Sequence, residues 1–258
     1  MEPNHKFVCR AYLGSQKVKA KNHRILFDVN TPGRCSISVE GSPKVNTIIA
    51  VDIGWGESIS RVFLGYIERV QASEKGWSEL FCRELAALLF KPLDITLRHP
   101  TLMQLLSDVT NKTGLQFVVP EAAYSKTSIP CFYSDGNGYR VMDELSQAFG
   151  IEDLFWQQQG NGQIYVGTWK DSYWADKPVT IPDSLMTGHT AAKSVKIPAS
   201  PKLRPGAIVN GLRLVGVDFQ GTEVKLTWII FNNVVRRTAP ERTGCGPAPW
   251  ARYVQTRS

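Results

Sequence analysis

The stretch Thr101-Leu-Met-Gln-Leu-Leu-Ser-Asp-Val-Thr-Asn-Lys-Thr-Gly114, followed by Leu115-Gln-Phe-Val-Val119, decides the fold of this chain. Its apolar residues recur with the spacing of one helix face, and its glycine suits the left-handed position that ends a helix. The plan repeats in Tyr139-Arg-Val-Met-Asp-Glu-Leu-Ser-Gln-Ala-Phe-Gly150, which leads into strands at 154–156 and 163–166. The turn Ser134-Asp-Gly-Asn-Gly138 is suited to capping the second helix. We therefore predict an α+β module built from a repeated helix–strand unit.

The residues before this module have the pattern of β-strands. Period-2 alternation marks 34–40, a buried run covers 47–53, and a long strand at 61–71 returns through a turn to 77–82. Gly65 in the middle of the long strand indicates a bulge or a sharp bend, as strands need at barrel corners. Several short strands at regular spacing predict a small barrel or sandwich.

The residues after the module return to β. A connector rich in Pro, Asp and Lys is followed by a Pro205-Gly206 turn of the type II kind and by strands at 208–215, 217–219 and 222–231. The predicted fold class is mainly β, with two small β-barrels flanking the α+β insert. The expected divisions are 1–95 for the first barrel, 96–170 for the module, 171–187 for the connector, 188–235 for the second barrel, and 236–258 for a basic irregular tail that completes this barrel or forms an interface.

Charge is unevenly distributed along the 258 residues, which carry a formal net charge of +7. The last part of the chain holds several arginines against one acidic residue, Glu241, and a second basic stretch covers 17–24. Such a tail is either a solvated segment or a contact for an acidic neighbour. Placement in this tail gives four candidate interface residues: Arg236, Arg237, Trp250 and Tyr253.

A search for catalytic and ligand-binding patterns finds none that predicts an enzyme. The sequence lacks the nucleophile elbow, the phosphate loop and the HExxH zinc motif. Its cysteines and histidines are too scattered for metal-ligand spacing. We therefore expect no catalytic residues, no cofactor and no metal. The aromatic residues of 155–174 are either a stacking platform for bases or sugars or the core of the module with a docking patch, and we favour the second interpretation.

The sequence also indicates where the protein is made. No apolar run reaches the roughly 18 residues that span a bilayer. The first residues, Met1-Glu-Pro-Asn-His-Lys6, contain no apolar core of a signal peptide. We expect a chain that is made and folded in a cytoplasm and has no membrane span.

Three stretches, in their order along the chain, resemble the baseplate hub family of phage tails, which includes the late control D protein and the 43-kDa tail protein of Mu-like phages. Phe63-Leu-Gly-Tyr-Ile-Glu68 is similar to the family's first-barrel strand, and Phe81-Cys-Arg-Glu84 to the exit of that barrel, with Cys82 in place of the usual Gly. Leu203-Arg-Pro-Gly-Ala-Ile-Val-Asn-Gly211 is similar to the opening of the second barrel. The module resembles the short N-terminal domain of secretins and TonB-dependent receptors.

The resemblance implies a structural function. Hub proteins of this family are homotrimers whose six quasi-equivalent barrels adapt a six-fold tail tube to a three-fold central spike, around a channel for tape measure protein and DNA. The implied partners are other copies of the chain, the tail tube or distal tail protein, the spike and the tape measure, with DNA only in transit. The implied location is the virion tail baseplate, assembled in the host cytoplasm. Alternatives are another tail-tip component, such as a distal tail ring, or a nucleic-acid- or glycan-binding β protein.

Overall fold

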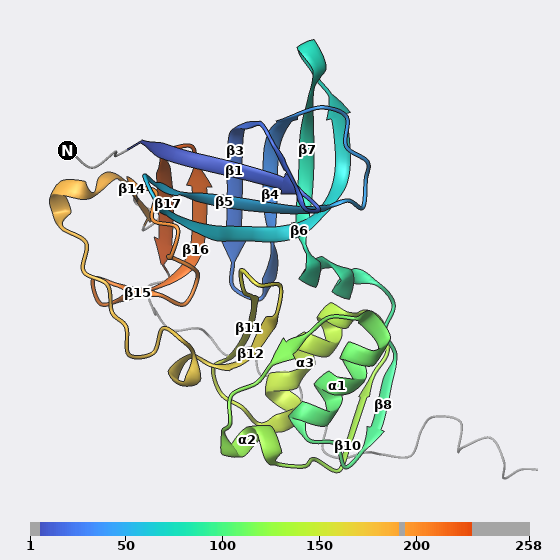
Figure 1. Ribbon diagram of the computed structural model, residues 1–258. Coiled ribbons are helices and arrows are strands. Elements are labelled where there is room, and N and C mark those ends of the chain that lie inside the picture. Colours follow the sequence, from blue (N-terminus) through green and yellow to red (C-terminus); the bar gives the residue numbers. More distant parts are fainter. Residues whose placement is uncertain (1–5, 191–193, 229–258) are drawn as a thin grey trace, which may run out of the picture.

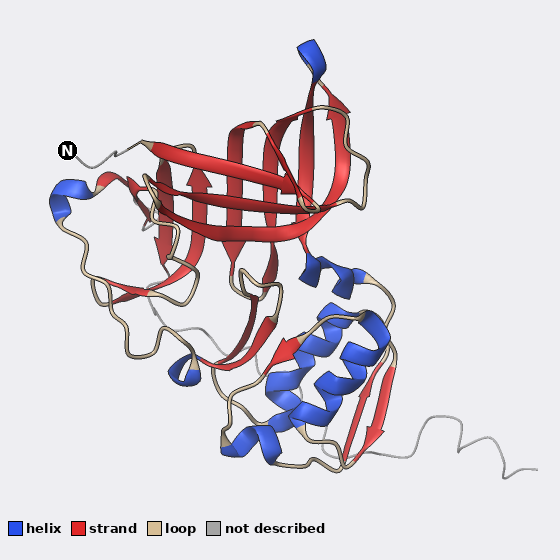
Figure 2. Cartoon of the chain, viewed as in Figure 1, coloured by secondary structure: helices blue, strands red, loops and turns tan. Residues whose placement is uncertain are grey.

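The computed structural model describes residues 6–190 and 194–228. In this part of the chain the protein is mainly β, and its longer helices gather in one module (Figures 1 and 2). The prediction of a mainly β chain with an α+β insert is confirmed at this level. The N-terminal region contains β1 (Phe7–Leu13), β2 (Gln16–Val18), β3 (Ala20–Asp28), β4 (Thr31–Glu40), β5 (Ile48–Trp55), β6 (Ser58–Ala72) and β7 (Trp77–Glu84), with the 3-10 turns η1 (Glu74–Gly76) and η2 (Leu85–Phe90).

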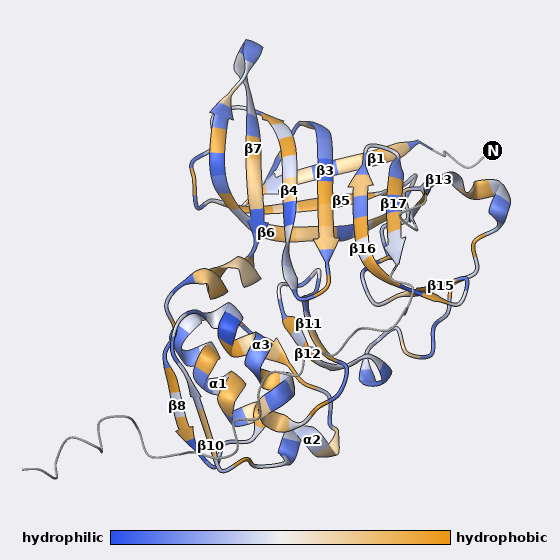
Figure 3. Ribbon diagram, turned by 180° about the vertical axis from the view of Figure 1, so that it is seen from behind, coloured by the Kyte–Doolittle hydropathy of each residue, from blue (hydrophilic) through white to orange (hydrophobic). Residues whose placement is uncertain are grey.

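The long strand β6 joins two layers of the N-terminal region. Its first half pairs with β5 and its second half with β7. As a result, β1, β5 and β6 cross β3, β4 and β7 at a steep angle (Figures 1 and 3). Gly65 lies where β6 pairs with both β5 and β7. A Cβ atom at this position would stand 2.0 Å from the carbonyl oxygen of Arg83. A close approach of two backbones therefore requires glycine here, whereas the register shifts of β6 lie between Arg61 and Phe63 and between Ile67 and Arg69.

The C-terminal strands continue the same sheet. β16 pairs antiparallel with β3 through Gly216–Gln220 and with β17 on its other side. The strand order is β13-β14-β17-β16-β3-β4-β7-β6-β5-β1-β2, with β15 paired to β16. Within the described residues this path is open, so two closed barrels are not confirmed: the strands expected in separate barrels share one sheet. The C-terminal strands are β13 (Thr187–Thr190), β14 (Ser194–Pro198), β15 (Ile208–Val209), β16 (Leu212–Gln220) and β17 (Glu223–Trp228), preceded by the 3-10 turns η3 (Trp169–Asp171) and η4 (Asp183–Leu185).

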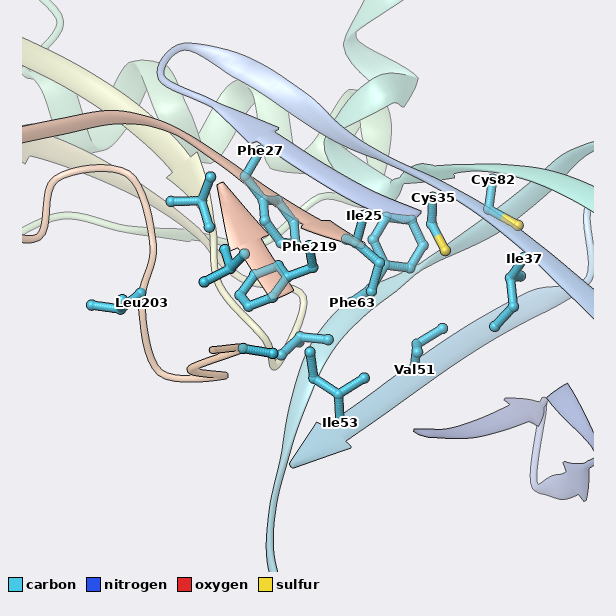
Figure 4. Packing of buried hydrophobic residues seen from close by; sticks show 14 of the residues in the cluster. Ile25, Phe27, Cys35, Ile37, Val51, Ile53, Phe63, Cys82, Leu203 and Phe219 are labelled. Carbon is cyan, nitrogen blue, oxygen red and sulfur yellow. The ribbon is translucent and has the colours of Figure 1, made fainter. Parts of the chain in front are cut away.

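One hydrophobic core serves both ends of the chain. Fully buried side chains from β3, β6 and β16 pack together, with the rings of Phe27 and Phe219 6.4 Å apart in an edge-on arrangement. Figure 4 shows these rings gathered with Phe63, and Cys35 and Cys82 beside them. Apolar and polar residues alternate along the strands (Figure 3), as expected for a sheet with one covered face. Burial of this apolar surface is what holds the N- and C-terminal strands together.

The middle module has its own core and the predicted helix ends. Thr101 forms a capping box with Gln104, and Gly114 ends the first helix at φ 76°. Asn137, in the predicted turn, caps the second helix, and Gly150 ends it at φ 62°. Parallel pairing of β9 with β12 and antiparallel pairing of β11 with β12 form a small sheet beside the helices. The module contains β8 (Ile95–Arg98), α1 (Leu102–Thr113), β9 (Phe117–Val118), α2 (Ala123–Lys126), β10 (Cys131–Ser134), α3 (Gly138–Phe149), β11 (Leu154–Gln158) and β12 (Ile164–Thr168).

Of two local predictions in the C-terminal region, one differs from the structure and one agrees with it. The strands expected at 208–215 and 217–219 form one continuous strand, β16, after the short β15, because Gly216 stays within the ladder to β3. The Pro205-Gly206 turn is present as predicted: the Ala207 amide donates to the Arg204 carbonyl at 3.1 Å, and Gly206 has a φ of 96°.

Candidate functional site

A buried carboxylate lies where the three regions of the chain meet. Glu84, the last residue of β7, is only 2% exposed. Its Oε2 atom accepts a hydrogen bond from the Gly33 amide at 2.7 Å, and its Oε1 atom lies 3.4 Å from Nη1 of Arg204. A Cβ atom on Gly33 would come within 2.9 Å of the Glu84 carboxyl carbon. The absence of a side chain at Gly33 therefore makes room for the carboxylate.

Arg204 approaches this carboxylate from the loop between β14 and β15. Its side chain is 12% exposed and donates a hydrogen bond to the backbone carbonyl of Val62 on β6. The guanidinium carbon lies 4.0 Å from the ring centroid of Phe27, in a cation–π contact. One arginine from the C-terminal region is thus held by three groups of the N-terminal region: Glu84, Val62 and Phe27.

Burial dominates the electrostatics of this pair. Removal from water raises the pKa of Glu84 from 4.5 to about 7, although the positive charge of Arg204 and the Gly33 amide act in the opposite direction. Burial likewise lowers the pKa of Arg204, against the effect of Glu84. Both charged forms are therefore disfavoured by their surroundings, because the attraction within the pair does not fully replace the lost hydration.

The middle module reaches the same place through the hairpin of β11 and β12. The buried amide of Gln158 accepts a hydrogen bond from the Ala86 amide at 2.9 Å and donates one to the Leu64 carbonyl at 2.8 Å. The Trp156 amide donates to the side chain of Asn30 at 2.8 Å. At the hairpin turn, a Cβ atom on Gly160 would stand 2.9 Å from the Arg61 carbonyl. Together with Glu84 and Arg204, these contacts define the three-region junction.

The aromatic residues that the sequence singles out are mostly core residues. Phe155 stacks on Trp169 with 3.5 Å between ring centroids, and Trp156 is buried in the module core. Tyr165 donates its hydroxyl to the Thr168 carbonyl at 3.0 Å. Tyr173, by contrast, is 66% exposed. This arrangement favours the interpretation of a core with a small exposed patch over an open stacking platform.

The predicted interface residues Arg236, Arg237, Trp250 and Tyr253 lie outside the described residues. The second basic stretch lies on β2 and β3, where several cations have partners within the chain. Lys19 pairs with Glu40 at 3.0 Å. Arg24 pairs with Asp218 at 2.7 Å, and Lys21 lies 4.1 Å from the ring centroid of Trp77. Pairing within the sheet accounts for much of this positive charge.

The junction contains all three stretches that carry the family resemblance. Leu64 comes from the first, Glu84 from the second and Arg204 from the third. Sequence reasoning selected these stretches but not their mutual contact, since a salt bridge between positions 84 and 204 leaves no periodic signal. It also missed Gly33 and Gln158, whose roles depend on the close approach of distant strands.

Chemically, the junction is suited to holding parts of the protein together. Its polar atoms are largely satisfied by one another, and its carboxylate is shielded by Gly33 and Arg204. No group of three metal-ligating side chains occurs in the part of the chain that the structure describes. Nor does any helix among the described residues have the length and apolarity to cross a membrane.

The fold is that of phage tail proteins. The chain aligns with the 43 kDa tail protein of prophage MuSo2 from Shewanella oneidensis at a TM-score of 0.65 and 10% identity, over 86% of this chain and 98% of that one. A tail protein from Neisseria meningitidis MC58 gives a TM-score of 0.64 at 12% identity, over 87% and 96% of the two chains. The resemblance to the Mu-like 43-kDa tail proteins expected from the sequence is thus confirmed in the fold.

Two further comparisons extend this result. The Escherichia coli c3393 protein, a type VI secretion component described as similar to the phage T4 tail proteins gp27 and gp5, aligns at a TM-score of 0.60 and 13% identity, over 89% of this chain and 78% of that one. In sequence, the chain is 30% identical over 223 residues to an uncharacterized 58.7 kDa protein of Haemophilus phage HP1. The aligned part covers 86% of this chain and 42% of that relative. No model of a known protein family matches the chain.

Proposed function

We propose that this chain is a structural component of a phage tail, and specifically the baseplate hub. The observation that carries this proposal is the agreement in fold with two phage tail proteins over nearly their full lengths. Sequence similarity to a protein of phage HP1 supports a phage origin. In this proposal three copies form a ring that adapts a six-fold tail tube to a three-fold spike and surrounds the channel for tape measure protein and DNA.

The continuous sheet suits a structural adaptor. β3 and β16 join strands from both ends of the chain into one sheet over one core. Such a body is rigid enough to transmit symmetry between a tube and a spike without catalysis. The solved structures with this fold are described as tail proteins and a secretion-system component, which supports a non-enzymatic role.

The proposal includes partners and a location. The partners are further copies of this chain, the tail tube or distal tail protein, the central spike and the tape measure protein. The location is the virion baseplate, after assembly in the host cytoplasm. We also propose the division at about 96–170 for the module, which the separate module core supports. The basic tail, with Arg236, Arg237, Trp250 and Tyr253, is proposed as a contact for an acidic neighbour.

The tail contact can be tested by changing its charge alone. The double variant Arg236→Gln/Arg237→Gln should bind the neighbouring tail protein more weakly, with a loss that shrinks at high salt because screening weakens the wild-type contact. The matched control is Lys44→Gln/Lys75→Gln, which removes two exposed charges far from the tail in sequence. Equal binding by both variants and the wild type would contradict a contact made through Arg236 and Arg237.

The proposed function is tested by reconstitution. The chain is mixed with tail tube and spike proteins of the same phage, and the products are weighed by native mass spectrometry. The expected complex contains three copies of the chain between the tube and spike subunits. Absence of any complex, combined with DNA binding that falls steeply with salt, would instead favour a nucleic-acid-binding β protein.

A further inference from the structure

The three-region junction contains an ion pair in an unfavourable place. Glu84 and Arg204 are both buried, yet their nearest charged atoms are 3.4 Å apart, longer than a strong charge-assisted hydrogen bond. By contrast, the exposed pair Arg24–Asp218 makes a contact of 2.7 Å. The cost of taking two charges out of water can exceed what their attraction restores, and replacement of such pairs by apolar residues is often neutral or stabilising. This pair therefore needs an explanation other than stability.

The geometry of the Glu84–Arg204 pair supplies an explanation other than stability, because the pair joins separate regions of the chain through directional contacts. A guanidinium is planar and donates only along defined directions. Arg204 meets the Glu84 carboxylate and the Val62 carbonyl, while its flat face rests on Phe27. The C-terminal strands are fixed to β3 by backbone pairing, whereas no described strand of the module pairs with this sheet. Apolar contacts are not directional and would permit small rotations of the module.

The hairpin of β11 and β12 in the module packs beside Arg204. A Cβ atom on Gly160 would stand 3.9 Å from Nη2 of Arg204, so the hairpin turn packs directly beside the guanidinium. Gln158 bonds the backbone of β6 at Leu64 and of η2 at Ala86. A displaced Arg204 would therefore open space under the hairpin and release one constraint on the module.

We propose that Glu84 and Arg204 are positioning residues, which fix the orientation of the module relative to the N-terminal strands, at a net cost in stability. Backbone pairing already fixes the C-terminal strands to β3, so the pair selects one orientation of the module from several that apolar contacts would accept. This inference concerns the isolated chain and does not depend on the proposed function.

The test separates orientation from stability. In the double variant Glu84→Gln/Arg204→Met, both charges are removed while the side-chain volumes are nearly kept. Nitroxide labels on genetically encoded non-natural residues at Lys75 and Tyr133, both exposed, report the distance between the N-terminal strands and the module. A large excess of unlabelled chain prevents signals between copies. We expect a thermal midpoint equal to or above that of the wild type, and a distance distribution at least twice as wide.

Two further variants complete the experiment. Arg24→Gln/Asp218→Asn removes the exposed pair and should leave the distance distribution unchanged. Arg204→Lys keeps the charge but loses the planar fork, so the distribution should widen although a positive charge remains. A double variant at the junction that fails to fold or melts several degrees lower would overturn the claim of a net cost. An unchanged distribution in this variant and in Arg204→Lys would overturn the positioning role.

Discussion

At the residue scale, two buried titratable side chains make the stability of this protein depend on pH in opposite directions. Glu84 sits at the junction with a raised pKa, and His23 lies on β3 beneath Phe7, whose ring stacks on it at 5.7 Å. Burial lowers the pKa of His23, and its Nε2 atom has no hydrogen-bond partner. Each shift makes the free energy of unfolding depend on pH, and this dependence should disappear when the residue is replaced by one that does not titrate.

The variant Glu84→Gln should lose part of the pH dependence between about pH 4.5 and 7. The pKa of this carboxyl rises from 4.5 to about 7 on folding. The folded protein therefore binds more protons in this range, and the contribution of Glu84 to stability is present below pH 4.5 and lost as the pH rises to about 7. Urea unfolding across this range should show a free energy of unfolding that falls more with rising pH in the wild type than in the variant, because the contribution of His23 is common to both. Parallel slopes would contradict the raised pKa.

The variant His23→Gln should change the acid side instead. The folded pKa of His23 lies below its ordinary value of 6.5, so the unfolded chain binds the proton first. Its contribution to stability is present above pH 6.5 and is lost as the pH falls through the lower folded pKa. On acidification, the wild type should therefore lose a share of its free energy of unfolding that the variant retains. Calorimetric midpoints that fall equally in both proteins would show that His23 does not titrate in this way.

Gly65→Ala should be strongly destabilising. The added Cβ atom would meet the Arg83 carbonyl at 2.0 Å, which forces β6 and β7 apart. We expect a loss of more than about 2 kcal/mol in the free energy of unfolding, as for other backbone clashes in a core. Gly14→Ala is the control: its φ is 58° but nothing lies within 4 Å, so only about 1–2 kcal/mol is expected. Equal losses in the two variants would argue against a close approach at Gly65.

At the element scale, the helices of the module begin and end at signals that can be read in the sequence. Thr101→Ala removes the hydroxyl that accepts from the Gln104 amide at 3.2 Å. The expected loss is about 0.5–2 kcal/mol, because the capping box satisfies otherwise free amides at the start of α1. Ser107→Ala, at an exposed position of the same helix, should be neutral or slightly stabilising. Chemical denaturation of both variants measures the difference.

These local signals explain why the module could be predicted. The caps and the glycines at 114 and 150 act over one helical turn, so sequence alone places both helices. The sheet was harder to foresee. Pairing of β3 with β16 joins residues nearly two hundred positions apart, and short-range periodicity contains no information about it. For this reason the strands were predicted but the single open sheet was not.

The candidate site shows the same division. Gly65 and the Pro205-Gly206 turn were recognisable because backbone geometry restricts the residue type. The meeting of Glu84 with Arg204 was not, since an acidic residue at the end of one strand and an arginine in a distant loop each have many ordinary explanations. Only the folded chain brings them within 3.4 Å.

At the scale of the whole molecule, one sheet and one core connect both ends of the chain, while a second core forms the module. Two tail proteins match the overall fold at 10% and 12% identity. A protein organised in this way is suited to act by shape and symmetry, as the proposed hub would.

Solution mass is the measurement that tests the proposed hub most directly. Light scattering across a concentration series, with the chain alone and with added tail tube protein, gives the number of copies in each assembly. The hub proposal predicts three copies of the 28.8 kDa chain, either alone or with the tube protein present. A monomer at every concentration, even with tube and spike proteins present, would contradict it.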